Sequence, residues 1–436
     1  MGENPVTTAV SPTSPRSPQV NSSRIAFKIR KRIARFSGNV SSGLCLRAQH
    51  FVGDMIYGIG ASQSVLLSKI GRSLEEDIAL IKTEERLSRN LQRPELEAVV
   101  QENVLKMAAG HIGQDSLLIL DLSDITKKYA RKMEYLGTVH DGSAHDLGQG
   151  YWTLHIVGAE LDSDKLVPLY QRLWSCEAPN FVSENDEILR GVDAVMAHVG
   201  HRGVFVCDRG GDRINLFGPL LERKARFLVR LVGNRHLVCD GQTLPAEAVA
   251  RNCPCPFAKA VAKLDGDREV HYTLRFGFRK VYLPERAEPL YLLVVHGLGA
   301  EPLMLLTTEP LRKAYRCLWH WIRAYLRRWS IEETIRYVKT CYEVENVRVL
   351  NYQGLQNLMV LVLAVVFFAA CILDHDQRLR IMAHYVVRAA KRLFGVPDFK
   401  YYALSDGLSA LFSRHPGKPH RPARPPNASQ MELSLT

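Results

Sequence analysis

Hydrophobic residues are spaced in two ways along the chain, and the change of spacing divides the sequence. From about residue 60 to 110, apolar residues recur at helical spacing, as in SVLLSKIGRSLEEDIALIKTEERLSRNL, which predicts a small all-helical region. SLLILD (116–121) is instead a continuous apolar run that ends in an acid, which is typical of a strand buried on both faces. GVFVCD (203–208) is a second run of this kind.

The stretch between and after these two runs predicts three more strands and a helix. WTLHIVGAEL (152–161), KLVPLYQRLW (165–174) and RFLVRLV (226–232) have the composition of strands. Ser183 and Asp186 can form a capping box that opens the helix SENDEILRGVDAVMAHV. The order strand, strand, strand, helix, strand, helix, strand is that of an RNase H-like α/β core with a mixed sheet.

Two aspartates close the two buried strands. Asp121 and Asp208 are expected at the carboxyl ends of central strands, where open α/β sheets place their sites. Asp124 and Asp212 are close rivals, but each lies past its strand end, where a turn or capping role is the ordinary alternative.

Beyond residue 235 the helical pattern disappears and later returns. VHYTLRFGF (270–278) alternates apolar and polar residues strictly, which predicts a β-rich insertion. The patterns together divide the chain into a disordered basic tail (1–37), a helical DNA-binding domain (38–110), the first part of the core (111–234), the insertion (235–310), a core helix with a glutamate (311–350), a C-terminal helical region that is a candidate for dimerisation (351–411) and a flexible basic Pro-rich tail (412–436).

The charge balance favours a polyanionic partner. The chain has 57 Lys and Arg against 45 Asp and Glu, a net charge of +12, and such a surface attracts phosphates. Nucleic acid is therefore the first partner to consider, and a solvated basic surface is the alternative. No apolar segment follows the N-terminal charges, so no secretory signal is expected.

Two other features point to different kinds of site. The nine cysteines contain no CxxC pair, and the spacing of His236, Cys239, Cys253 and Cys255 matches no standard zinc site, which favours reduced thiols. Residues 358–373 are uncharged and apolar, but sixteen residues fall short of the roughly 20 that a spanning helix needs. A helix buried in a protein core is the preferred interpretation, and a membrane span is the alternative.

The stretch YLRRWSIEETIRYVK (325–339) places one glutamate among basic residues. On a helix, Tyr325, Arg328, Glu332 and Lys339 lie within an arc of roughly 60°. The ordinary interpretation is an amphipathic helix whose Glu332 pairs with Arg328 or Arg336, worth about 0.2–0.5 kcal/mol. Together with Asp121 and Asp208, however, Glu332 would complete three carboxylates, which suit two Mg²⁺ ions and phosphodiester chemistry.

The spacing of Tyr325, Arg328, Glu332 and Lys339 resembles the YREK signature of bacterial insertion-sequence transposases, the cut-and-paste branch of the DDE, RNase H-like superfamily. Three segments resemble further motifs of that family in the right order: LILDLSDITK around the first aspartate, VCDRGGD around the second, and RFLVR after it. PLMLLTTEP precedes the glutamate helix as the end of the family's insertion does.

The resemblance implies an activity, a cofactor and partners. Its implied metal ligands are Asp121, Asp208 and Glu332, holding two Mg²⁺ ions for which Mn²⁺ can substitute. Its implied DNA contacts are Tyr325, Arg328 and Lys339 on terminal phosphates, with Arg226 and Arg230 as further candidates and edge-strand charges as the equal alternative. The implied protein is a homodimer in the bacterial cytoplasm, at the nucleoid, that pairs terminal inverted repeats, cuts them and joins their 3′-OH ends to target DNA.

One departure from the family concerns the aromatic residue that stacks on a flipped base. The family takes a tryptophan from the insertion, whereas the five tryptophans here lie outside it, at 152, 174, 319, 321 and 329. The aromatic candidates in the insertion are Tyr272, Phe276, Phe278, Tyr282 and Tyr291. Two other functions stay open: a DDE-type nuclease without strand transfer, and a DNA-binding repressor with a retired core.

Overall fold

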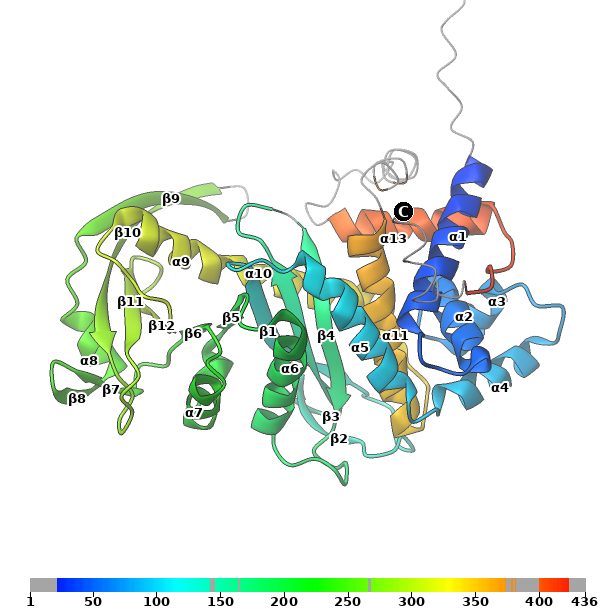
Figure 1. Ribbon diagram of the computed structural model, residues 1–436, viewed down its shortest axis with the longest axis horizontal. Coiled ribbons are helices and arrows are strands. Elements are labelled where there is room, and N and C mark those ends of the chain that lie inside the picture. Colours follow the sequence, from blue (N-terminus) through cyan, green and yellow to red (C-terminus); the bar gives the residue numbers. More distant parts are fainter. Residues whose placement is uncertain are drawn as a thin grey trace, which may run out of the picture.

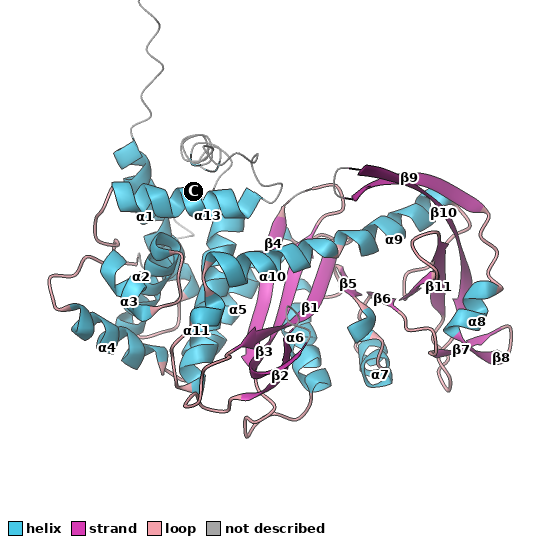
Figure 2. Cartoon of the chain, turned by 180° about the vertical axis from the view of Figure 1, so that it is seen from behind, coloured by secondary structure: helices cyan, strands magenta, loops and turns pink. Residues whose placement is uncertain are grey.

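The computed structural model describes residues 22–141, 146–163, 165–265, 268–373, 378, 381 and 400–422. In Figure 1 the described part is elongated: helices α1–α4 and α13 gather at one end, a mixed sheet lies in the middle, and strands β7–β11 lie at the other end. Figure 2 gives the same order from behind. The chain is thus a mixed α/β protein whose sheet separates two different end regions.

Helices dominate the first hundred residues described. They are α1 (Ser22–Val40), α2 (Leu46–Ser62), α3 (Leu67–Ser73), α4 (Leu80–Leu91) and α5 (Leu96–Ala108), followed by the 3₁₀ turn η1 (Ala109–His111). Helix α1 begins at Ser22, inside the tail of residues 1–37 that the sequence predicts to be disordered. Ala26, Ile29, Ile33 and Phe36 recur on one face of α1 and are buried, so the basic stretch has an apolar side to pack. Residues 1–21 lie outside the described residues.

The central sheet contains the strands expected from the apolar runs. They are β1 (Leu117–Thr126), β2 (Gly137–Asp141), β3 (Asp146–Ala159), β4 (Leu166–Trp174), β5 (Val204–Cys207) and β6 (Phe227–Arg230). β1 pairs in parallel with β5, and β5 with β6, whereas β3 is antiparallel to both β1 and β4. The sheet order is β2-β3-β1-β5-β6-β12-β11-β10-β9, with β4 on β3. The element order matches the expectation apart from β2, which has no clear periodicity.

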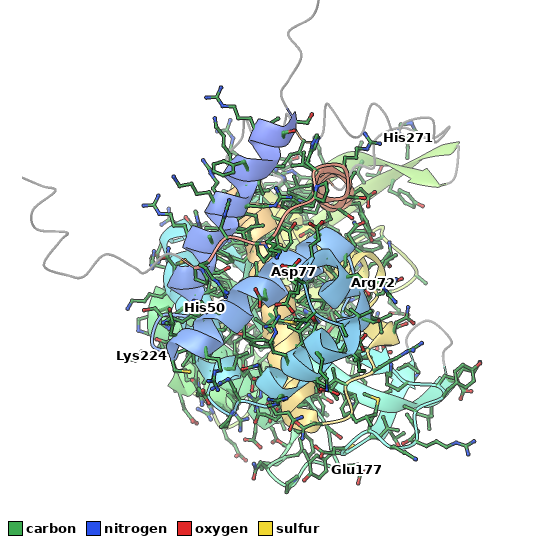
Figure 3. All side chains as sticks on the ribbon, turned by 90° about the vertical axis from the view of Figure 1, so that its right-hand side faces the viewer. His50, Arg72, Asp77, Glu177, Lys224 and His271 are labelled. Carbon is green, nitrogen blue, oxygen red and sulfur yellow. The ribbon has the colours of Figure 1, made fainter. Side chains whose placement is uncertain are left out.

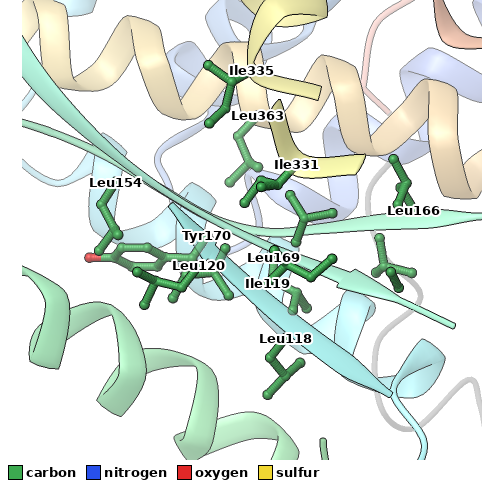
Figure 4. Close-up of a cluster of buried hydrophobic side chains, with 14 of the residues drawn as sticks. Leu118, Ile119, Leu120, Leu154, Leu166, Leu169, Tyr170, Ile331, Ile335 and Leu363 are labelled. Atoms are coloured by element: carbon green, nitrogen blue, oxygen red, sulfur yellow. The ribbon is translucent and has the colours of Figure 1, made fainter. Parts of the chain in front are cut away.

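Both faces of this sheet are covered, which explains why β1 is apolar on both sides. Helix α6 (Glu184–Val199) opens on the expected cap, where the Ser183 hydroxyl accepts a hydrogen bond from the Asp186 amide at 3.1 Å. In Figure 4, Ile331 and Ile335 approach the strands from one side, while Leu154 and Tyr170 lie on the other. The second cluster lies beneath α6, since a Cβ at Gly191 would approach Leu154 to 2.7 Å. Helix α7 (Ile214–Glu222) follows η2 (Arg209–Gly211).

The segment 235–310 is rich in strands: the first two pair with each other in a separate small sheet, and the last four extend the central sheet. They are β7 (His236–Cys239), β8 (Gln242–Pro245), β9 (Phe257–Asp265), β10 (Arg268–Val281), β11 (Leu290–His296) and β12 (Leu303–Thr307), with the short helix α8 (Ala246–Arg251). β12 pairs antiparallel with β6, through Leu305–Arg230 to Thr307–Leu228. Backbone hydrogen bonds therefore run without interruption from the core strands to this end of the molecule.

Three helices then return the chain across the sheet to the N-terminal end. They are α9 (Tyr315–Arg327), α10 (Trp329–Cys341) and α11 (Tyr352–Phe367), with the 3₁₀ turn η3 (Val344–Asn346) before α11 and the π-helical turn η4 (Phe368–Ile372) after it. Tyr352–Ile372 is long and apolar enough to cross a membrane, but 89% of its apolar window is buried inside the protein. It packs on β4, α5 and α2, as a core helix does.

The last described segment docks on the first helices. After α13 (Lys400–Arg414), residues 415–422 cross α1 and α2; we call them the C-terminal strap. The Tyr57 hydroxyl donates to the carbonyl of Gly417 at 3.0 Å, and Phe27 meets His420 edge to face. The predicted flexible tail of residues 412–436 is therefore ordered over its first part. Backbone contacts of this kind leave no apolar pattern in the sequence.

Candidate active site

The sheet brings Asp121 and Asp208 together. On the parallel strands β1 and β5, Ile119 pairs with Val206, and each aspartate lies two residues beyond that pair at the carboxyl ends of the paired region. Both aspartates line one pocket of about 170 Å³ beneath α6 and α7, together with Cys207, the last residue of β5. Asp208 directly follows the last residue of β5, whereas Asp121 lies inside β1, which continues to Thr126 along β3; the strand end predicted at Asp121 is therefore wrong, although both acids line one pocket.

Burial and a neighbouring negative charge determine the ionisation of Asp121. Desolvation, with the negative charge of Asp208 added to it, raises the pKa of Asp121 to about 7, although the Arg328 guanidinium opposes the shift. The same burial and the two aspartates raise the pKa of the Cys207 thiol to about 12, so the thiol is not a nucleophile here. Asp208 is held by the Gly210 amide, which donates to its Oδ1 at 2.7 Å.

Helix α10 brings Glu332 to the same place through Arg328. The Arg328 Nη2 donates to Glu332 Oε1 at 2.7 Å, and its Nη1 lies 3.8 Å from Asp121 Oδ2. Only 9% of the Arg328 side chain is exposed, and its Nε has no hydrogen-bond partner in the described part of the chain. The Arg328–Glu332 pair is the one that a plain amphipathic helix predicts, but here its arginine is buried beside Asp121, while 40% of the Glu332 side chain is exposed.

The remaining two residues of the stripe also face β1 and its neighbours. Tyr325 is 3% exposed, and the Arg328 guanidinium lies 5.8 Å from the centroid of its ring. Lys339 donates to Asp124 Oδ1 at 3.2 Å and lies 3.3 Å from Glu345. The helix is interrupted at Arg328, where α9 ends and α10 begins, which the continuous periodicity did not indicate.

The two rival aspartates have structural partners. Asp212 is 1% exposed at its side chain, accepts the Val232 amide at 2.6 Å and pairs with Arg235 at 2.6 Å. Asp124 accepts from Thr126 at 2.7 Å as well as from Lys339. These contacts fix loops and helices, and Asp212 does not line the pocket of Asp121 and Asp208.

The two arginines of the next strand lie at opposite ends of it. Arg226 precedes β6 and forms two hydrogen bonds with Glu309, at 2.7 and 2.8 Å, so the structure does not bring it to the acids. Arg230 closes β6, one residue beyond Val229, which pairs with Cys207. It thus lies at the same edge of the sheet as Asp208.

Other candidate groups are placed elsewhere. Phe276 is fully buried against Tyr315 and Trp319 and cannot stack on a base, while the other aromatic candidates of the insertion are partly buried. The expected zinc alternative gains no support, since no group of three or more His, Cys, Asp or Glu in the described ranges is arranged to hold a metal ion. Sequence reasoning missed Tyr129, which is 86% exposed in the loop after β1.

The carboxylates of Asp121 and Asp208 suit a hard divalent cation, but Glu332 does not line their pocket, and no three such side chains in the described ranges are grouped to hold an ion. Asp121 and Asp208 offer carboxylate oxygens in one pocket, and the raised pKa of Asp121 reflects a buried negative pair that a cation would relieve. Glu332 is engaged with Arg328 in the arrangement described above. It becomes a ligand only if that guanidinium moves aside.

Comparisons with known proteins give a distant likeness among solved structures. No protein-family model matches the sequence, and no curated protein matches it either. Among solved structures, the synaptic complex of piggyBac transposase with hairpin DNA is similar over 95% of this chain and 84% of that chain, at 13% sequence identity and a TM-score of 0.41.

Proposed function

We propose that this protein is a DNA transposase of the DDE type with an RNase H-like core. The observation that carries the proposal is the pocket shared by Asp121 and Asp208 at the carboxyl edge of parallel strands, with Glu332 joined to Asp121 by Arg328. The strand order β4-β3-β1-β5-β6, with β1, β5 and β6 parallel, supports the RNase H-like assignment.

Each proposed residue has a defined task. Asp121, Asp208 and Glu332 would hold divalent cations, which supply charge neutralisation on the phosphoryl group and an activated oxygen nucleophile. Arg328 and Lys339 lie beside these acids and would orient a terminal phosphate once DNA displaces their present carboxylate partners, and Tyr325, which is buried against the Arg328 guanidinium, would join them once it is uncovered. The net charge of +12 supports a polyanionic partner.

A cleavage assay with the chain's own element ends and Mg²⁺ tests the assignment. Asp208→Ala and Glu332→Gln are expected to abolish cleavage, by at least about 10³-fold, while binding of the ends in EDTA is retained. Glu333→Gln is the matched control, because Glu333 is the adjacent acid and pairs with Arg336 on the surface.

Cleavage that survives in Asp208→Ala or Glu332→Gln would remove this assignment. Joining of the cut ends to a target plasmid then separates a transposase from a nuclease that lacks strand transfer. Wild-type protein that binds the ends but never cuts them would favour the retired, DNA-binding alternative.

A further inference from the structure

The loop after the first acidic strand has a composition that the proposed catalytic site does not use. Residues 127–134, KKYARKME, leave β1 directly after Thr126; we call them the KKYARK loop. Lys128, Tyr129, Arg131 and Lys132 are exposed, and Tyr129 is the most exposed large hydrophobic side chain described, at 86%. A tyrosine in water surrounded by cations has no folding role at that position.

The loop is nevertheless fixed at both ends. Lys127 donates through its Nζ to the carbonyls of Glu345 and Val347, each at 2.6 Å. At the other end, the Glu134 amide donates to the Leu350 carbonyl at 2.9 Å, and Met133 is buried. The loop therefore projects its exposed residues from a rigid base rather than from a mobile tether.

These anchors connect the loop to the elements that carry the acids. Lys127 continues the strand of Asp121, and its carbonyl partners follow α10, which carries Glu332. At the usual rise of a strand, Lys127 lies about 20 Å from Asp121. That distance corresponds to about six base pairs of a duplex, so one DNA molecule can span both places.

The exposed side chains combine an aromatic face with unpaired cations. The Lys128 Nζ lies 5.7 Å from the centroid of the Tyr129 ring. Lys128, Arg131 and Lys132 form no ion pair with any residue in the described ranges of the chain. Cations that follow a phosphate backbone, together with a ring on which a base stacks, are the two parts of a single-strand binding surface.

We propose that the KKYARK loop binds DNA at an unpaired nucleotide, with Tyr129 stacking on the exposed base and Lys128, Arg131 and Lys132 holding the adjacent phosphates. The choice of DNA rests on the proposed function, whereas the presence of a binding surface rests on the loop alone. A lipid surface is disfavoured because the loop exposes one ring and no aliphatic side chain that could enter a bilayer.

The test measures binding by the full-length protein in EDTA, so that no cleavage occurs. The probes are a duplex with one unpaired 2-aminopurine and a fully paired duplex of the same length. We expect Tyr129→Leu to weaken binding of the unpaired probe about 5- to 100-fold and to abolish quenching of its fluorescence. Tyr129→Trp is expected to restore both, because leucine keeps apolar area and tryptophan keeps the stacking face.

Further variants separate stacking from charge and from general damage. Lys128→Ala combined with Arg131→Ala is expected to weaken both probes and to flatten the salt dependence by about 2 in the slope of log K against log salt. Tyr135→Leu is the matched control, since that ring lies in the same connection but packs edge to face on Tyr352. It is expected to leave quenching unchanged.

Unchanged affinity and quenching in Tyr129→Leu would overturn the proposal. The proposal would also be overturned if Tyr129→Leu lost binding to vesicles of phosphatidylserine and phosphatidylcholine while its DNA binding was unaffected. The loop would then be a lipid contact. These binding assays contain no Mg²⁺ and are therefore independent of the cleavage assay. If the wild-type protein stacks on the probe but never cleaves element ends, the proposed function is refuted and this inference stands.

Discussion

At the scale of single residues, burial determines what each acid can do. Asp121 is largely enclosed beside Asp208, and the Arg328 guanidinium, which lies 3.8 Å away, also pairs with Glu332. Glu332 is more exposed, with 40% of its side chain in solvent, and makes the shorter pair with Arg328. The same side-chain type therefore has two different tasks in the metal-free protein: one acid holds a proton, and the other holds an arginine.

The first prediction concerns stability of the metal-free protein against pH. The pKa of Asp121 is raised in the folded state to about 7, from 3.8 in the unfolded chain. The folded state therefore binds the proton more tightly, and its advantage, complete below about pH 4, is lost as pH rises through 7. At pH 8 the ionised carboxylate costs up to about 4 kcal/mol.

Asp121→Asn removes this cost. In EDTA, we expect the variant to unfold at a higher urea concentration than the wild type at pH 8, with a clearly smaller gain at pH 5. Asp193→Asn, which changes an exposed aspartate paired with Arg223, is the control and should shift neither curve. An equal shift at both pH values would show that Asp121 is not strained by ionisation.

At the scale of elements, the sequence predicts the features that depend only on residues close together in the chain. The apolar runs Leu117–Leu120 of β1 and Val204–Cys207 of β5 are recognisable because both faces are covered there, whereas the rest of β1 alternates with polar residues. Asp121 and Asp208 can be found in the sequence for the same reason, because each directly follows one of these apolar runs. The contact of Arg328 with Asp121 and the pairing of β12 with β6 join segments far apart in the chain, and no periodicity encodes such register.

Polar residues of the apolar helix α11 show the same limit. Asn357 is fully buried and donates from its Nδ2 to the carbonyls of Leu91 and Arg93, at 2.6 and 2.7 Å. It therefore satisfies backbone groups where α4 ends, which joins the N-terminal helices to the core. The sequence alone shows Asn357 only as a polar residue before an apolar run.

The second prediction follows from that position. Asn357→Leu leaves the buried Leu91 carbonyl without its side-chain donor and the Arg93 carbonyl with the Leu96 amide at 3.4 Å, and it is expected to lower the free energy of unfolding by about 1–3 kcal/mol. Gln92→Leu removes an exposed amide beside the same turn and should change it by less than about 0.5 kcal/mol. Denaturant unfolding of both variants measures the difference, and equal effects would contradict the role given to Asn357.

At the scale of the whole molecule, the C-terminal strap completes a basic pocket on the N-terminal helices. The pocket has a volume of about 680 Å³ and is lined by Arg47, His50, Arg86, Arg89 and Arg93 together with Lys418 and Arg421 of the strap. Arg86 is neutralised by Asp54 and Glu76, at 2.8 and 2.7 Å. Figure 3 views this end of the molecule, with His50 and Asp77 on its face.

The third prediction tests this pocket as a contact for duplex DNA. Arg47 and Arg89 are exposed, and we find no ion pair for either in the described ranges. Arg47→Ala combined with Arg89→Ala is expected to weaken binding to element ends at low salt and to flatten the slope of log K against log salt by about 2. Lys106→Ala, an exposed cation on α5 outside the pocket, is the control.

Measurements of DNA binding over a series of salt concentrations give both quantities. A slope that stays at the wild-type value, or that changes as much in Lys106→Ala, would remove the pocket from the DNA-binding surface. Cleavage assays are not needed for this outcome, so it stands apart from the catalytic assignment.

The pairing of β12 with β6 has a mechanical consequence. Strands β9 to β12 continue the sheet whose strand β5 precedes Asp208. That end of the protein is therefore joined rigidly to the core through backbone hydrogen bonds. A load placed on its outer strands travels through the hydrogen-bond ladder to β6 and β5, beside Asp208. Force applied to the outer strands is thus expected to reach the carboxylates, and pulling experiments should register one rupture rather than a soft extension before it.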